Sequence, residues 1–472
     1  MRPNPKVLSA TLAGLLLILG MSFSSISKDA SKYVQAATIN TKPGTIKPVT
    51  KPTTNVISGT ELGETFKVCN NSTKITPTKS STIKVFSSLP TITYSTIASA
   101  LDAAEKSKKS IVTISICEGT YTEDIEISTT KNVTFKGEGK GVTIKGTGDK
   151  YSIFTIQNAC GSTDAFCYGK TNFENISLTK GTALATGTIK TIPKTTKTTK
   201  TTDERTVVKE YPKTGIMIDS PGWCNTEPCS IDTAYLNIKK GTFSGLNNAI
   251  YVRGKVEVTV DGSTFTNFRG DSKGVETSVI HANSGGEISV ASGTAAETCD
   301  YSLSPLITLK NVSMYNNSAG IGALFLSEGS RIILDGAKIY KNKGAMLGYI
   351  NSCSTITLTN KTEWYSNTPT SNSLALSGDS EAVIENSTLK DNTSGWYGAA
   401  LMGGRKVTIS GSTFSNNKSD KTGGALYFSG TSLTSTGSIW SGNSPDDVFH
   451  KTENKAYTFG TSDFSCDTSG CR

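Results

Sequence analysis

The sequence predicts an all-β fold, a parallel β-helix in which one rung takes about 25 residues. The first observation is a column of bulky residues at 25-residue spacing, 26 at the last step: Met314, Ile339, Trp364, Leu389, Phe414 and Trp440. The second is a column of asparagines, each three residues further on: Asn317, Asn342, Asn367, Asn392, Asn417 and Asn443. The third is the composition, since 18% charged residues and 45 Gly argue against a helical bundle or coiled coil. So short a rung buries its apolar residues only by stacking on neighbours about 4.8 Å away, which predicts a solenoid.

The repeat also predicts turns and strands within each rung. A column of Asn and Gly, the residue types that most readily adopt a left-handed turn, comprises Asn311, Gly336, Asn360, Asn386 and Gly411. A column of short apolar strands comprises residues 323–326, 347–350, 374–376, 399–402 and 425–428. Looser copies occur at 215–219, 248–254 and 278–285. We expect the column from Asn317 to Asn443 to form a ladder, in which each side-chain amide bonds to the amides of the rungs above and below.

The chain begins with the residue order of a secretory signal peptide, expected over 1–36. Arg2 and Lys6 precede an apolar run over 7–23, and small residues suited to cleavage follow. An uncleaved anchor helix is the alternative, although the run is short for a membrane span. We therefore expect a secreted protein, extracellular or attached to a cell wall or surface, with no transmembrane segment once the signal is removed.

The remaining chain is expected to form a linker, a β-helix and a tail. Residues 37–85 are rich in Thr, Lys and Pro and predict an extended linker. The β-helix is expected over 86–450, with a Thr- and Lys-rich surface loop at about 186–212. A short helix over 96–107, with apolar residues at helical spacing, is expected to cap its start. Residues 451–472 are expected to be a C-terminal tail.

Ten cysteines in a secreted chain predict disulfides. Three pairs are close in sequence and are the natural candidates: Cys160 with Cys167, Cys224 with Cys229, and Cys466 with Cys471. Longer bridges of open connectivity are left for Cys69, Cys117, Cys299 and Cys353. Because the chain has only two His residues, no zinc site is expected, nor any other metal or cofactor.

The chain carries ten Asn-x-Ser/Thr sequons, so a host with the machinery would make it a glycoprotein. They are Asn70, Asn71, Asn132, Asn175, Asn311, Asn316, Asn360, Asn386, Asn392 and Asn417. We expect Asn392 and Asn417 to stay unmodified because they also lie in the ladder column. Asn360 and Asn386, in the turn column, are available for modification.

The net charge of +9 comes from 48 basic residues, of which 41 are Lys and seven are Arg. Proteins that read nucleic acids usually rely on Arg for bidentate contacts, so no nucleic acid partner is expected. The charge is interpreted as an aid to solubility and a mild attraction to anionic polymers.

Residues 91–146 resemble the opening of pectin methylesterases, within the pectin lyase-like superfamily. The resemblance rests on TIASALDAAEKS, ISICEGTYTEDIEI and NVTFKGEGKGVTIKG, and residues 119–123 match the family's GxYxE segment. In the C-terminal rungs, FSNN (414–417) and GGAL (423–426) resemble the FxxN and GGA repeats of polymorphic outer membrane proteins, which are adhesins. Both resemblances imply a right-handed β-helix.

The catalytic segments of these families are not found. The chain lacks segments like QDTL, DFIFG and LGRPW of methylesterases, the NTD, DD and HG motifs of polygalacturonases, and the vWIDH motif of pectate lyases. The adhesins carry a C-terminal membrane barrel, whereas this chain stops about 30 residues after its last rung. The resemblance therefore implies the fold and neither catalysis nor a membrane role.

One column of ionisable residues is a candidate site. Asp219, Arg253 and His281 follow strands of three early rungs and precede a bland polar run: Ser327, Asn351, Ser377, Gly403 and Ser429. Stacked roughly 5 Å apart, the three would bind a uronic acid and, in an enzyme, move a proton. The alternative is that they are solvated turn residues and that Asp219 and Arg253 form a surface ion pair.

Other residues join this candidate site. We assign three nearby residues to the same candidate ligand-binding site: Asp261, Arg269 and Asp271. Aromatic residues in or near loops are candidates for stacking on sugars: Trp223, Trp396, Tyr397 and Tyr365. The paired carboxylates Asp446 and Asp447 are expected to face solvent.

Two functions remain open. The first is a secreted, non-catalytic β-helix that binds polysaccharide or a cell-surface glycan, preferably anionic, in a wall, coat or adhesion role. The second is a polysaccharide-active enzyme, a lyase, hydrolase or esterase of the pectin lyase-like class. The missing catalytic segments favour the first.

Overall fold

The computed structural model describes residues 63–70, 92–147, 150–160, 165–180, 214–220, 230–269, 278–284, 301, 303–319 and 324–472. These residues belong to one compact unit, residues 61–472. The expected signal peptide, the surface loop at 186–212, and both Cys224 and Cys229 lie outside the described residues.

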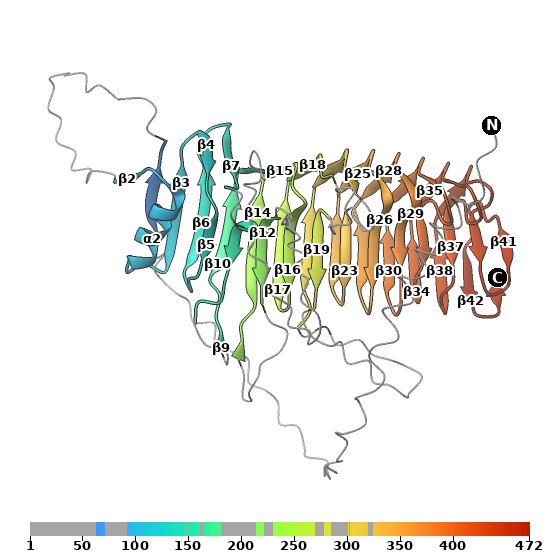
Figure 1. Cartoon of the computed structure of the whole chain (residues 1–472). Coiled ribbons are helices and arrows are strands. Elements are labelled where there is room, and N and C mark those ends of the chain that lie inside the picture. Colours follow the sequence, from blue (N-terminus) through green and yellow to red (C-terminus); the bar gives the residue numbers. More distant parts are fainter. Residues whose placement is uncertain are drawn as a thin grey trace, which may run out of the picture. The chain divides into compact units, whose positions relative to one another are not determined.

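Most rungs contribute one strand to each of three sheets, named A, B and C here (Figure 1). In one C-terminal rung, β24 (Arg331–Asp335) belongs to sheet A, β25 (Lys338–Tyr340) to sheet B and β26 (Lys343–Asn351) to sheet C. The strands of the next rung pair in parallel with all three. The predicted parallel β-helix is therefore confirmed.

Sheet A begins inside the segment that was expected to be a linker, because β1 (Glu64–Val68) pairs in parallel with β3 (Ile111–Ile116). Its strands, in spatial order, are β2 (Thr93–Tyr94), β1 (Glu64–Val68), β3 (Ile111–Ile116), β6 (Asn132–Gly137), β10 (Lys170–Glu174), β14 (Ala234–Lys239), β17 (Val256–Asp261), β20 (Leu306–Lys310), β24, β27 (Thr355–Thr359), β30 (Glu381–Glu385), β34 (Lys406–Ser410), β38 (Ser432–Thr436), β42 (Phe464–Asp467) and β43 (Gly470–Cys471).

Sheet B consists of short strands whose central residue points inward. They are β4 (Gly119–Thr122), β7 (Val142–Lys145), β11 (Ser177–Thr179), β15 (Thr242–Ser244), β18 (Thr264–Thr266), β21 (Ser313–Tyr315), β25, β28 (Glu363–Tyr365), β31 (Thr388–Lys390), β35 (Thr413–Ser415) and β39 (Ile439–Ser441). The predicted column from Met314 to Trp440 occupies these inward positions and is at most 2% exposed. Burial of each such side chain stabilises the fold by roughly 1.5–3 kcal/mol.

The early strands of sheet C alternate buried and half-buried residues, which places every second side chain on the outer face of the sheet. Further along the same face, Leu326 and Ala375 are buried, at 8% and 1% exposed. The strands of sheet C are β5 (Ile125–Ile127), β8 (Ser152–Ile156), β12 (Thr214–Asp219), β16 (Asn248–Arg253), β19 (Ile280–Asn283), β23 (Phe325–Glu328), β26, β29 (Thr368–Leu376), β33 (Leu401–Gly403), β37 (Leu426–Phe428), β40 (Val448–His450) and β41 (Lys455–Tyr457). Shorter pairings join β9 (Ala165–Phe166) to β13 (Ser230–Ile231), β32 (Thr393–Ser394) to β36 (Lys418–Ser419), and β22 (Ser318–Ala319) to β26.

The predicted asparagine ladder is confirmed between sheets B and C. The Oδ1 atom of Asn417 accepts hydrogen bonds from the backbone N–H of Asn392 (3.2 Å) and from its Nδ2 (2.9 Å). The same Nδ2 also donates to the carbonyl oxygen of Trp364 at 2.9 Å. The five ladder amides from Asn317 to Asn417 are at most 1% exposed, and each is bonded in this way to the amide of the next rung.

The ladder ends on a buried carboxylate. Asn443 donates its Nδ2 to Oδ1 of Asp447 at 2.8 Å, and Asp447 is 3% exposed. Its neighbour Asp446 is 7% exposed and accepts the backbone N–H groups of Gly423 and Gly424. Burial raises the pKa of Asp446. The expectation that both carboxylates face solvent is wrong, because both are buried and accept hydrogen bonds, Asp447 in the place of a further ladder amide.

The predicted turn column is confirmed between sheets A and B. All five of its residues have φ between 47° and 65°, the left-handed region: Asn311, Gly336, Asn360, Asn386 and Gly411. Asn and Gly adopt this region at the least cost, which explains why they alternate here.

The predicted capping helix is α2 (Ile97–Lys106), at the N-terminal end of the stack (Figure 1). Thr96 is its N-cap, and the Thr96 side chain accepts a hydrogen bond from the backbone N–H of Ser99 at 3.1 Å. One face of the helix is buried: Ile97, Ala100, Leu101 and Ala104.

Residues of the GxYxE segment hold this helix in place. The Glu123 carboxylate accepts the backbone N–H groups of Ile97 (2.9 Å) and Ala98 (3.0 Å), at the positive end of the helix. Tyr121 is 2% exposed and donates its hydroxyl to the carbonyl oxygen of Cys117 at 2.9 Å. In this chain the segment therefore builds the N-terminal cap.

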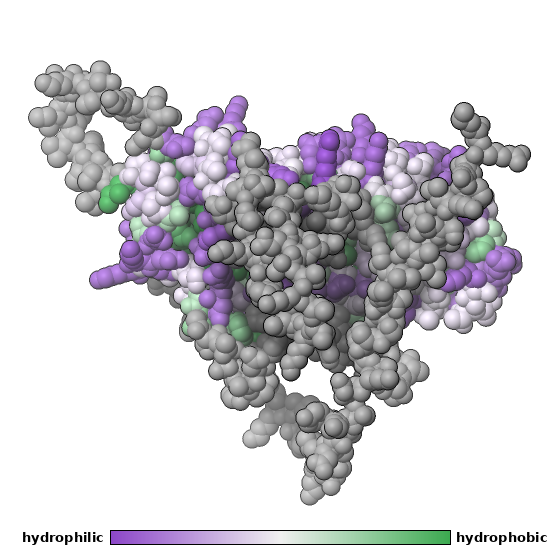
Figure 2. All heavy atoms as spheres, in the orientation of Figure 1, coloured by the Kyte–Doolittle hydropathy of each residue, from purple (hydrophilic) through white to green (hydrophobic). Residues whose placement is uncertain are grey.

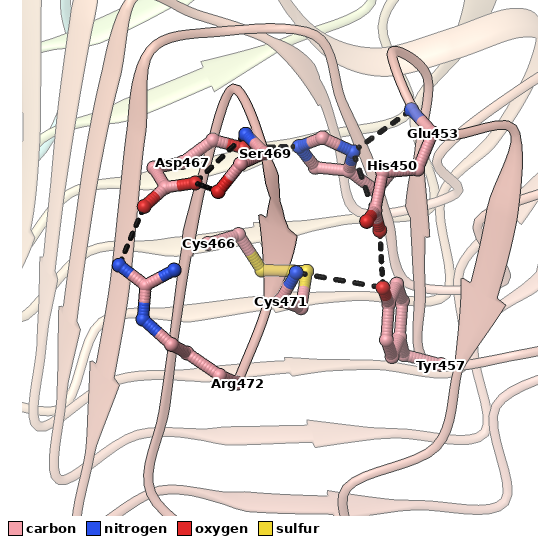
Figure 3. Close-up of a disulfide and its surroundings, with 8 residues drawn as sticks. All are labelled: His450, Glu453, Tyr457, Cys466, Asp467, Ser469, Cys471 and Arg472. Carbon is pink, nitrogen blue, oxygen red and sulfur yellow. Dashed lines mark hydrogen bonds and ion pairs between the residues drawn. A yellow bond between two sulfur atoms is a disulfide. The ribbon is translucent and has the colours of Figure 1, made fainter.

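Residues 451–472, expected to be a tail, fold as a cap over the last rungs. Strand β42 pairs antiparallel with β38, β41 pairs antiparallel with β40, and β43 closes a hairpin with β42. The Cys466–Cys471 disulfide joins the two strands of that hairpin (Figure 3). Ser469 and Arg472 bond the carboxylate of Asp467, and the Ser469 hydroxyl contributes most to lowering its pKa.

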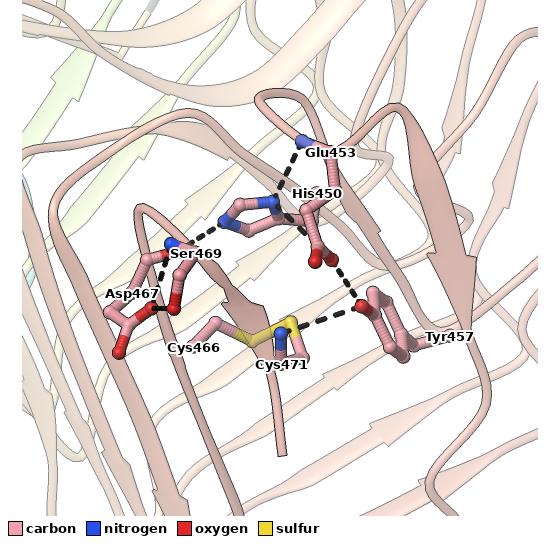
Figure 4. A network of polar contacts seen from close by, with 7 residues as sticks. All are labelled: His450, Glu453, Tyr457, Cys466, Asp467, Ser469 and Cys471. Atoms are coloured by element: carbon pink, nitrogen blue, oxygen red, sulfur yellow. Dashed lines mark hydrogen bonds and ion pairs between the residues drawn. A yellow bond between two sulfur atoms is a disulfide. The ribbon is translucent and has the colours of Figure 1, made fainter.

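His450 fastens the cap to the stack (Figure 4). It is fully buried, and its Nδ1 accepts the backbone N–H of Glu453 at 3.2 Å, so its Nε2 donates to the carbonyl oxygen of Asp467 at 2.7 Å. Tyr457 donates its hydroxyl to Glu453 and accepts the backbone N–H of Cys471.

Two other disulfides join described residues, Cys69–Cys117 and Cys160–Cys167. Cys353 is also disulfide-bonded. Helix α2 is too short to cross a membrane, and the described residues contain no apolar helix that is long enough.

Candidate functional site

The outer face of sheet C carries two columns of side chains that continue from rung to rung. The first, the apolar column, comprises Met217, Tyr251, His281, Leu326, Tyr349, Ala375, Met402, Tyr427 and Phe449. The second, the polar column, lies two residues further along each strand and comprises Asp219, Arg253, Asn283, Glu328 and Asn351. Side chains two residues apart on a strand share a face, so the columns run next to each other.

The structure brings Asp219 and Arg253 together but places His281 in the other column. Arg253 is paired with Asn283 on the next strand, whereas His281 is paired with Tyr251. The predicted alignment was therefore wrong by two residues at His281. The early rungs lack the 25-residue spacing that fixes the later ones, because Arg253 follows its partner by 34 residues and precedes Asn283 by 30.

The ion pair of the polar column is bidentate. Arg253 donates its Nε to Oδ1 of Asp219 at 2.5 Å and its Nη2 to Oδ2 at 2.8 Å. The hydrogen bond to Asp219 raises the pKa of Arg253. Both side chains are about 40% exposed, so the pair contributes at most about 1 kcal/mol to stability. On the next rung after Arg253, Asn283 donates its Nδ2 to Oε2 of Glu328 at 3.0 Å.

His281 lies in an apolar environment. The centroids of the His281 and Tyr251 rings are 4.7 Å apart, and Leu326 is the residue paired with His281 on the strand of the opposite side. Burial lowers its pKa to about 4 because desolvation disfavours the charged imidazolium. The side chain is therefore neutral at pH 7.

The two carboxylates of the polar column are far apart. Asp219 and Glu328 are separated by three rung steps, about 14 Å at 4.8 Å per rung. The carboxylate pairs that hydrolyse glycosidic bonds lie about 5–10 Å apart. The polar column therefore does not provide such a pair.

The other predicted site residues do not join this face. Asp261 ends a strand of sheet A, where its Oδ1 accepts Nδ2 of Asn311 at 3.2 Å. Arg269 is exposed and forms an isolated parallel β-bridge with Ser318. Asp271 lies outside the described residues. In the described part of the chain, no cluster of His, Cys, Asp and Glu is suited to a metal ion.

Of the predicted aromatic residues, Tyr365 ends a stack on sheet B. Its ring lies 5.1 Å from that of Tyr340, which lies 5.2 Å from that of Tyr315, and the planes are within 15° of parallel. Most ring faces are covered by one another, so the stack stabilises neighbouring strands. Hydrophilic side chains line this edge of the molecule, at the top of Figure 2.

Trp396 and Tyr397 join the C-terminal end of the apolar column, while Trp223 lies outside the described residues. Together with Tyr427 and Phe449 they form a cluster that we call the aromatic platform. The sequence analysis did not predict Tyr427 and Phe449. Each lies between two buried residues of its strand, and this alternation could have indicated that both face outward.

Two family profiles match the chain. The profile "Right handed beta helix region" matches residues 214–439, and the profile "Pectinesterase" matches residues 85–184. The second match confirms the resemblance of the opening to methylesterases. The resemblance of the C-terminal rungs to polymorphic outer membrane proteins stays a prediction.

A crystal structure of the Dettilon tailspike protein is a solved neighbour, at 11% sequence identity and a TM-score of 0.27. The alignment covers 77% of this chain and 64% of the tailspike chain. No curated protein matches the sequence significantly. From the stacked parallel sheets and the two profiles, we conclude that the chain is a right-handed parallel β-helix whose opening is similar to pectinesterases.

Proposed function

We propose that the protein binds a linear polysaccharide along the outer face of sheet C without cleaving it. The observation that carries this proposal is the apolar column beside the polar column. Sugar rings have apolar C–H faces and polar edges, and a binding site for them combines both kinds of side chain. Because the columns repeat about every 4.8 Å along the stack, a linear polymer contacts several rungs at once.

The state of the ionisable groups supports binding over catalysis. Asp219 is held in a bidentate pair by Arg253, and Glu328 is about 14 Å away from it. His281, with a pKa of about 4, is a weak base at neutral pH. The Arg253 guanidinium group remains suited to bind the carboxylate of an acidic sugar, which would replace the Asp219 carboxylate as its partner.

We place the protein outside the cell, in a wall, coat or adhesive layer. The disulfides of the described residues support this location, because oxidising compartments preserve such bonds. The N-terminal apolar run after Arg2 and Lys6 supports export.

The test compares polygalacturonate with its methyl-esterified form, which has the same backbone without the charge. We expect calorimetry to detect binding of both, tighter for polygalacturonate at low salt, with no reducing ends or unsaturated uronates released. Added salt weakens the charged component because exposed charges are screened within about 10 Å at 0.1 M.

Two arginines offer a matched control. Arg253→Ala is expected to weaken polygalacturonate binding, whereas Arg405→Ala, which breaks a similar pair with Glu381 (2.6 Å), is not. If the wild type released sugar products and His281→Ala abolished that release, the enzyme interpretation would replace this one.

A further inference from the structure

The aromatic platform is a group of four rings at the C-terminal end of the apolar column. The ring centroids of Trp396 and Tyr397 are 5.6 Å apart, those of Tyr397 and Tyr427 4.6 Å, and those of Tyr427 and Phe449 5.5 Å. Tyr427 and Phe449 stand opposite each other on β37 and β40. The platform therefore joins a loop to the outer face of sheet C.

The loop that carries Trp396 is held in one conformation. The Ser394 hydroxyl accepts the backbone N–H of Trp396 (3.2 Å) and donates to the carbonyl oxygen of Tyr397 (3.3 Å). The Trp396 carbonyl oxygen accepts the backbone N–H of Lys421, from the next rung, at 3.1 Å. A loop fixed in this way orders few residues on binding, which lowers the entropic cost.

Trp396 is the most accessible ring of the platform. It is 38% exposed, and the other aromatic side chains of the described residues are half-buried or buried. Its three neighbours are half-buried. Two of them are tyrosines, so the platform combines flat apolar faces with hydroxyl and indole N–H groups.

Resting on the function proposed above, we propose that the platform is the anchoring subsite for the polysaccharide, where an uncharged face of a pyranose ring stacks on Trp396. A protein partner would require a larger apolar patch than one accessible ring with polar tips. The subsite continues into the apolar column through Met402, the strand partner of Tyr427. Stacking requires no charge, so this part of the binding does not depend on salt.

The experiment uses the full chain and methyl-esterified oligogalacturonate, the uncharged probe. Trp396→Ala is expected to weaken its binding about 3- to 10-fold, at both low and high salt, while Trp396→Phe keeps most of the affinity. Tyr365→Ala, which removes an aromatic side chain from sheet B, is the matched control and leaves the affinity unchanged.

Fluorescence gives a second readout. Trp364 and Trp440 are at most 2% exposed, so Trp396 is the accessible indole of the described residues. The probe is expected to protect wild-type fluorescence from acrylamide, and this protection is lost in Trp396→Ala.

The outcomes separate this inference from the proposed function. If Trp396→Ala bound the probe like the wild type while Arg253→Ala bound polygalacturonate poorly, the platform would be excluded and the function would stand. If the wild type bound neither polymer, both would fall. If Trp396→Ala instead turned a dimer into a monomer in sedimentation, the platform would be a contact between copies, and the inference would be overturned.

Discussion

Adjacent residues in the turn between sheets B and C perform different tasks. Asn416 has φ of 53° and is exposed, whereas Asn417 is fully buried in the ladder. In the turn between sheets A and B, Asn360 is likewise left-handed, and Thr362, two residues on, donates its hydroxyl to the carbonyl oxygen of Leu334. An Asn-x-Thr sequon arises there from the needs of the turn. At this position the sequon is therefore a product of the fold.

Replacing Asn417 by Ala is expected to lower the free energy of unfolding by about 1–3 kcal/mol, because Asn392 and Asn443 lose a buried partner. Urea unfolding measures this cost. Asn416→Gly is the control and should cost little, since Gly accepts the left-handed turn. An unchanged stability, or a glycan on Asn417 found by mass spectrometry, would contradict the structural role.

His281 should make stability depend on pH. Its pKa is about 4 in the folded protein against 6.5 ordinarily, so the unfolded chain binds the proton more readily. The contribution is present above pH 6.5 and is lost as the pH falls towards 4, by up to about 3 kcal/mol. Unfolding free energies at pH 7 and pH 4 should differ less in His281→Gln than in the wild type. Equal differences in the two proteins would refute this.

At the scale of strands, the C-terminal rungs were predictable because their columns repeat without insertions. The position of the ladder, the inward column and the left-handed turns all follow from one spacing. The early rungs insert segments of different lengths between strands of sheet C, so the column slipped at His281. In the candidate site, the sequence indicates Trp396 and Tyr397 because they lie in a loop. It does not indicate Tyr427, because Tyr427 lies in an apolar strand whose other residues are buried.

The N-terminal helix offers a test of the GxYxE segment. Glu123→Ala removes the acceptor of two helix N–H groups and is expected to cost about 1–2 kcal/mol of unfolding free energy. Glu126→Ala is the control, because that exposed carboxylate pairs only with Lys150 among the described salt bridges and contributes little. Equal costs for the two variants in urea unfolding would argue against the capping role.

At the scale of the whole stack, both ends need protection because each leaves unpaired strand edges. Helix α2 covers the first rungs. At the other end, antiparallel strands pair with the free edges of β38 and β40, and the buried carboxylate of Asp447 accepts the last amide of the ladder, that of Asn443. A parallel β-helix thus ends by changing strand direction, which the repeat itself did not predict.

Removing residues 451–472 should therefore expose these edges. We expect the truncated chain to lose the burial of Phe464, roughly 2 kcal/mol, and the hydrogen bond from His450 to Asp467. It should then associate through β38 and β40, which size-exclusion chromatography with light scattering detects as oligomers. Cys466→Ser with Cys471→Ser keeps the strands and loses only the cross-link, so this variant should remain a monomer if the wild type is one. A truncated chain as monomeric and as stable as the full chain would mean that the segment is a tail after all.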